Sequence, residues 1–113
     1  MDVRLVQLLG SFIGARSQYS LARLEFALHY PRSKAPPVIG RLAEPSERAL
    51  REEWPLLESQ LDAALLFAQS AERRRRRKLM KDEAYRWLQR SLREMDQYAR
   101  AIRWVLTVTD ARE

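Results

Sequence analysis

A continuous run of cations, Arg-Arg-Arg-Arg-Arg-Lys at residues 73–78, lies inside a segment that strongly favours helix. No Gly or Pro occurs from Leu56 to Glu113, and helix-forming residues dominate that stretch. Neighbouring residues of a helix lie ~100° apart, so six consecutive cations surround it and leave no face for a core. The run therefore predicts a solvated helix end, a turn between helices, or a surface that contacts a polyanion.

The composition indicates a single helical domain over residues 1–113. Of these residues 46% are hydrophobic and 32% are charged, which is typical of a folded globular chain with one core. Cys is absent, which excludes disulfides and thiolate metal sites. The apolar run from Leu5 to Ile13 lacks the features of a signal peptide and is too short to span a bilayer. We expect a cytoplasmic protein without integral membrane association.

Two apolar stripes predict a first helix over residues 2–29. The first stripe repeats at three- and four-residue spacings and contains Leu5, Leu8, Phe12, Ala15, Tyr19, Ala22 and Phe26. The second contains Val6, Leu9, Ile13, Leu21, Leu24 and Leu28. So wide an apolar surface favours dimerisation or burial in a larger complex. Residues 30–45 are rich in proline and predict an extended connector, with Pro45 as the first residue of the next helix.

Two further helices are predicted, over residues 45–72 and 82–108, with a basic turn or helix extension at 73–81 and a frayed tail at 109–113. Pro55 predicts a kink or a split in the earlier helix. If one straight helix continued through both segments, their apolar stripes would face directions ~170–190° apart. We therefore expect an antiparallel hairpin with the arginines at its tip; the alternative is one continuous helix in an oligomer. The expected fold is all-α, an elongated three-helix bundle.

A basic ridge is predicted along the last helix, on the side opposite its apolar stripe, and continues from the arginine run. Guanidinium groups suit phosphate, and Arg and Trp stack on exposed bases. The alternative is a solvated helix face partly paired with carboxylates. The candidate nucleic-acid-binding residues are Arg73, Arg74, Arg75, Arg76, Arg77, Lys78, Lys81, Arg86, Arg90, Arg93, Arg100, Arg103 and Trp104.

The sequence gives little support to catalysis. His29 is the one histidine and follows Glu25 by four residues, but no third metal ligand accompanies this pair. Di-iron, phosphate-binding glycine, Walker and Gly-x-Ser-x-Gly motifs do not occur. We expect no catalytic residue, no metal, no cofactor and no small-molecule substrate.

Two functional hypotheses follow from the charge and the apolar patterns. The leading one is a non-enzymatic regulatory or architectural protein that binds DNA or RNA through its Arg-rich surface. No helix-turn-helix or zinc pattern supports base-specific recognition. The alternative is a protein–protein adaptor or inhibitor that docks on an acidic partner surface, or a subunit of a larger complex. We therefore expect nucleic acid as one partner, and a second protein or a second copy of the chain as another.

Overall fold

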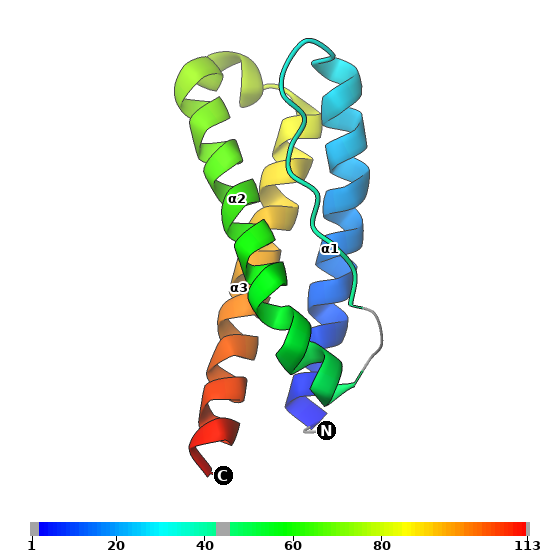
Figure 1. Cartoon of the computed structure of the whole chain (residues 1–113). Helices are drawn as coiled ribbons and strands as arrows, with labels where there is room; N and C mark the ends of the chain where they lie inside the picture. Colours follow the sequence, from blue (N-terminus) through cyan, green and yellow to red (C-terminus); the bar gives the residue numbers. More distant parts are fainter. Residues whose placement is uncertain (1–2, 43–45, 113) are drawn as a thin grey trace.

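The computed structural model describes residues 3–42 and 46–112, with side chains as far as residue 108. It contains three helices, α1 (Val3–His29), α2 (Glu47–Leu79) and α3 (Glu83–Arg112). Figure 1 shows them packed side by side, with α1 and α2 running in one direction and α3 in the other. The molecule measures 49 × 23 × 19 Å along its principal axes. The predicted all-α, elongated three-helix bundle is confirmed.

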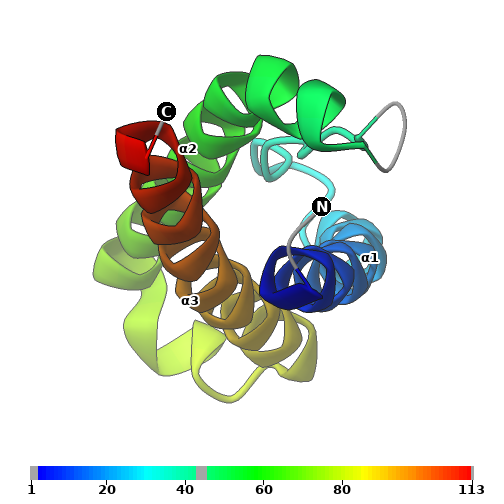
Figure 2. The same ribbon diagram turned by 90° about the horizontal axis from the view of Figure 1, so that it is seen from below.

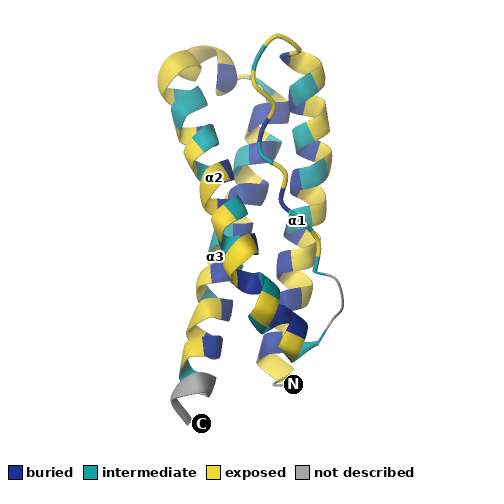
Figure 3. Ribbon diagram, in the orientation of Figure 1, coloured by how far each residue is buried: buried dark blue, intermediate teal, exposed yellow. Residues whose placement is uncertain are grey.

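The central element of the bundle is α3, which packs against both α1 and α2. Its residues Leu88, Met95 and Ile102 have no exposed surface. Figure 3 shows the buried residues of the three helices on the sides that face one another. A polar contact at the edge of the core joins α3 to α1, because the indole Nε1 of Trp87 donates to the Gln18 amide oxygen at 3.0 Å.

The connector lies as an extended strap between α1 and α2, as Figures 1 and 2 both show. The backbones of α1 and α2 lie further from each other than either lies from α3, but their side chains meet in the core, where the rings of Phe12 and Trp54 pack edge to face with centres 5.3 Å apart. Proline carbonyls of the strap accept hydrogen bonds from α1: the Tyr19 hydroxyl donates to Pro37 at 2.5 Å and Arg23 Nε donates to Pro36 at 2.6 Å. Ile39 of the strap is buried in the core. Further hydrogen bonds run from Arg16 to the carbonyls of Ile39 and Gly40, and from the Gly40 N–H to Gln60.

The bounds of α2 and α3 differ in detail from those predicted. Ser46 caps α2, and its hydroxyl accepts the Ala49 N–H at 3.1 Å. The predicted first residue, Pro45, lies outside the described residues. Helix α2 continues through Pro55, and its one non-helical residue in the described chain is Arg75, with φ −141° and ψ 35°. At its far end α3 continues to Arg112, because no helix breaker follows residue 108.

The two apolar stripes of α1 differ in how far they are buried. Six of the seven residues predicted for the first stripe are buried, and in place of Leu8 the helix buries Leu9. Of the second stripe only Leu9 enters the core, while the remainder face solvent. The chain therefore covers one side of α1 and leaves an aliphatic surface on the other.

Candidate nucleic-acid interface

The arginine run forms the last turns of α2, and the chain reverses just beyond it at residues 80–82. All six side chains from Arg73 to Lys78 are exposed, as is Lys81. The helix kinks at Arg75 and ends at Leu79, which is buried again. Figure 1 shows this end of α2 bending over toward the start of α3. Both ends of the run are therefore held by the fold, while the cations between them remain in solvent.

Few of these cations are neutralised by carboxylates of the chain. Arg76 lies 3.9 Å from Glu72, and Lys78 Nζ lies 5.3 Å from the centre of the Tyr30 ring. Within the described residues no carboxylate lies at ion-pair distance from the other predicted cations at this end of the bundle. These unpaired cations are Arg73, Arg74, Arg75, Arg77, Lys81, Arg86, Arg90 and Arg93.

The predicted ridge on α3 divides into two parts. Arg86, Arg90 and Arg93 are exposed and line a shallow hollow that begins at Met80 in the turn. They therefore continue the basic surface from the end of α2, with Glu94 beside them. On the side facing α1, Arg86 and Arg90 line a second hollow that also contains Glu25 and Glu83. The other part of the ridge lies further along the helix and is neutralised.

Arg100 and Arg103 belong to that second part. Arg100 lies 3.2 Å from Asp96. Arg103 forms a short ion pair with Glu58 of α2, and this hydrogen-bonded carboxylate raises the pKa of Arg103 above its ordinary value. Because α2 and α3 are antiparallel, Glu58 in the first half of α2 lies beside Arg103 in the second half of α3, and the ion pair joins the two helices. The structure therefore gives Arg103 a contact within the bundle.

Trp104 lies far from the arginine run. It is 57% exposed, and the guanidinium carbon of Arg4 lies 5.9 Å from the centre of its ring. Residues 86 and 104 of one helix are ~27 Å apart along the axis, so Trp104 sits near the opposite end of the bundle. The structure does not bring this tryptophan together with the basic run.

Two cations that the sequence did not nominate join the surface. Arg32 and Lys34 follow the end of α1 and lie across a cavity from Arg74 and Arg75. Arg75 donates to the Ser33 hydroxyl at 3.5 Å, which links the kink to the connector. The sequence signal was present as two basic residues just after a helix end, but only the path of the connector places them beside the arginine run.

The cavity itself has a volume of about 210 Å³ and an apolar floor. Phe26 and Phe67 meet edge to face in its lining, with ring centres 6.0 Å apart. Tyr30 and Leu79 complete the apolar part. Among the described residues no carboxylate lines it, so a flat apolar group that carries negative charge fits its chemistry. We call the whole surface the basic end: Arg32, Lys34, Arg73–Lys78, Lys81, Arg86, Arg90 and Arg93.

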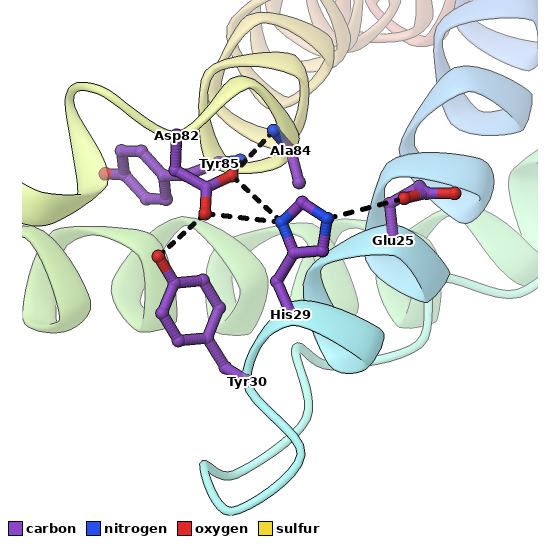
Figure 4. Close-up of polar contacts among 6 residues, drawn as sticks. All are labelled: Glu25, His29, Tyr30, Asp82, Ala84 and Tyr85. Carbon is purple, nitrogen blue, oxygen red and sulfur yellow. Dashed lines mark hydrogen bonds and ion pairs between the residues drawn. The ribbon is translucent and has the colours of Figure 1, made fainter.

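Asp82, in the turn after α2, joins the end of α1 to the start of α3, and Figure 4 shows its polar contacts. Its carboxylate caps α3 by accepting the backbone N–H groups of Ala84 at 2.8 Å and Tyr85 at 3.2 Å. It also accepts the Tyr30 hydroxyl at 2.8 Å, and His29 Nδ1 lies 3.3 Å from it. Burial alone would raise the pKa of Asp82, but the hydrogen bonds from Tyr30, Tyr85, His29 and Ala84 outweigh it and lower the pKa.

Replacing Asp82 by asparagine is expected to lower the free energy of unfolding by about 1–2 kcal/mol at neutral pH, because charged hydrogen bonds are lost. The folded-state pKa of Asp82 is depressed, so its contribution is present above the ordinary pKa and disappears as the pH falls through the folded value. Melting followed by circular dichroism from pH 7 to pH 2 measures the difference.

The free energies of unfolding of the wild type and of Asp82→Asn should therefore differ at pH 7 and become equal near pH 2. Asp62→Asn makes the same charge change at an exposed position of α2 and serves as the control. A difference between wild type and Asp82→Asn that stayed constant down to pH 2 would contradict the assignment.

His29 and Glu25 approach each other at 3.8 Å, and His29 also contacts Asp82. Nevertheless, the described part of the chain contains no group of three residues arranged to hold a metal ion. Among the described helices, none is both long and apolar enough to cross a membrane.

Comparison with models of protein families, with curated proteins and with solved structures finds no match for this chain.

Proposed function

We propose that this chain binds nucleic acid through the basic end, in a non-enzymatic regulatory or architectural role. The observation that carries the proposal is the set of exposed cations at one end of the bundle that, within the described residues, lack a carboxylate partner. Cations held close together create a strongly positive local potential, which attracts phosphate groups. Binding is also favoured because the nucleic acid releases its condensed counterions when the cations replace them. Most of these cations are arginines, whose planar fork binds phosphate oxygens in pairs.

The arrangement favours contact with the backbone over recognition of base pairs. The arginines surround the end of α2 and continue along α3. They therefore form a broad surface that can contact phosphates, rather than a single helix face that could enter a groove of the duplex and read base edges. The cavity between α1 and α2 offers an apolar site for one unstacked base, with Arg74 and Arg75 beside its phosphate. Single strands therefore suit this surface better than an intact duplex.

The test is the salt dependence of affinity for labelled 20-mers of single- and double-stranded DNA and RNA. If about six phosphates are engaged, affinity should fall by ~10³-fold between 50 and 200 mM salt. Single strands should bind more tightly than duplexes of the same length. Failure of every oligonucleotide to bind at 50 mM salt, or an affinity that ignores salt, would refute the proposal.

A second candidate function is that of a protein–protein adaptor or inhibitor, or of a subunit in a larger complex. The exposed aliphatic side of α1 favours it, because such a surface is typical of protein interfaces. The basic end would then suit an acidic protein surface. Absence of oligonucleotide binding together with formation of a stable protein complex would select this candidate.

A further inference from the structure

We infer that the exposed side of α1 is a dimer interface, on which a second copy of this chain packs antiparallel. Six aliphatic residues form this outer face and are between 43% and 74% exposed. They are separated by 3, 7, 8, 3 and 4 residues, all of which are sums of three- and four-residue steps, so they lie on one side of the helix. They are Val3, Val6, Ile13, Leu21, Leu24 and Leu28.

The six residues of the outer face carry no charge, although almost a third of the chain is charged, and the exposed Glu25 lies at their border. The cations nearest to it, Arg16 and Arg23, turn toward the connector and donate to its carbonyls. The whole chain carries a net charge of +6, so two copies repel one another wherever their charged surfaces meet. Contact through the outer face therefore lets two copies associate without bringing the cations of one copy against those of the other.

The exposed area matches what a dimer needs. Six aliphatic residues at these exposures present on the order of 600 Å², which is at the upper end for a patch on a monomer. Two outer faces that cover each other completely would therefore bury about 1,200 Å² in total, which is at the lower limit for stable specific interfaces.

Two glycines at the middle of the outer face have no explanation within one chain. A Cβ atom added at Gly10 or Gly14 would meet nothing of the described chain within 4 Å, and neither residue has a positive φ. Each costs about 1 kcal/mol of helix stability relative to alanine. Their absence of side chains is useful where a second helix approaches closely, and Ser17 extends the same small-residue region.

The sequence of large and small residues along the outer face is complementary to the same sequence running in the opposite direction. In an antiparallel pair with its two-fold axis between Gly14 and Ser17, large residues at the ends meet each other and Leu21 of one copy covers Gly10 of the other. The end pairs are Val3 with Leu28 and Val6 with Leu24. In a parallel pair the glycines would meet only one another and Leu21 would meet Leu21. The antiparallel register is therefore the better packed of the two.

The mass in solution tests the interface. By light scattering, the wild type should have twice the 13.3 kDa mass of the chain. Leu21→Lys with Leu24→Lys should be monomeric, whereas Leu56→Lys with Leu66→Lys should remain dimeric because those equally aliphatic, exposed leucines lie on α2. A monomeric wild type, or a double α1 variant that still dimerises, would overturn the inference.

Two further measurements fix the register and separate this inference from nucleic-acid binding. The chain contains no cysteine, so Val6→Cys and Leu24→Cys chains can be mixed and oxidised. Disulfides between the two variants are expected; disulfides of each variant with itself would refute the antiparallel register. Added salt should strengthen the dimer by screening its net charge, whereas it weakens nucleic-acid binding. Either proposal can therefore fail while the other stands.

Discussion

Replacing Arg73–Arg77 by glutamine should lower the affinity for an oligonucleotide by ~10³-fold or more at 0.1 M salt, because each lost contact between an arginine and a phosphate removes part of the electrostatic free energy of binding. The helix should persist, since glutamine favours it nearly as well as arginine and all five side chains are exposed. The slope of log affinity against log salt should become shallower by about 0.7–0.9 for each phosphate that is no longer bound. Fluorescence anisotropy at several salt concentrations measures both quantities.

A matched pair of double variants separates location from net charge. Arg73→Gln with Arg77→Gln removes two unpaired cations from the basic end. Arg48→Gln with Arg100→Gln removes the same charge from positions paired with Glu52 and Asp96. Only the first pair should weaken binding strongly. Equal losses in both would mean that net charge alone attracts the strand, and loss of the fold in the quintuple variant would mean that the arginines are structural.

Replacing Leu88 by alanine should destabilise the chain by about 2–5 kcal/mol, because the truncated side chain leaves a cavity. Leu88 has no exposed surface and belongs to α3, the helix that packs against both others. A domain of this size has a total stability of roughly 5–15 kcal/mol, so the loss is a large share of it. Urea unfolding at a fixed protein concentration measures it, since dimerisation makes apparent stability depend on concentration.

Leu66→Ala provides the control for that measurement. The same atoms are removed on α2 from a side chain that is 62% exposed. Its effect should lie within about 0.5 kcal/mol of zero. If the two substitutions had similar effects, α3 would not be the centre of the folding unit.

The fold could be predicted because apolar spacing fixes which side of a helix is buried. The stripe of Leu5, Phe12 and Tyr19 faces the core as expected. The phase difference between the two later stripes favoured a reversal over one continuous helix, and the reversal occurs at residues 80–82. The sequence could not place the kink of α2, since Arg75 is one of five identical residues and nothing local distinguishes it.

The candidate site was predictable in charge but not in extent. A run of cations around a helix has no buried side, so exposure of residues 73–78 followed from the sequence. Which cations remain unpaired depends on neighbours from other helices. Arg103 meets Glu58 only because α2 and α3 are antiparallel, and Arg32 reaches the basic end only through the bend after α1. Long-range contacts of this kind leave no local pattern.

The strap between α1 and α2 has a consequence for how the bundle comes apart. The strap contacts α1 through Arg16, Tyr19 and Arg23, which donate to its carbonyls. Helices α1 and α2 also meet directly through aromatic side chains such as Phe12 and Trp54, and α3 packs against both helices. Peeling away the strap would uncover the flank of α1 beside Ile39 and leave the pairing of α2 with α3 intact. Opening the bundle between α1 and α2 therefore breaks both the hydrogen bonds of the strap and the aromatic contacts beneath it.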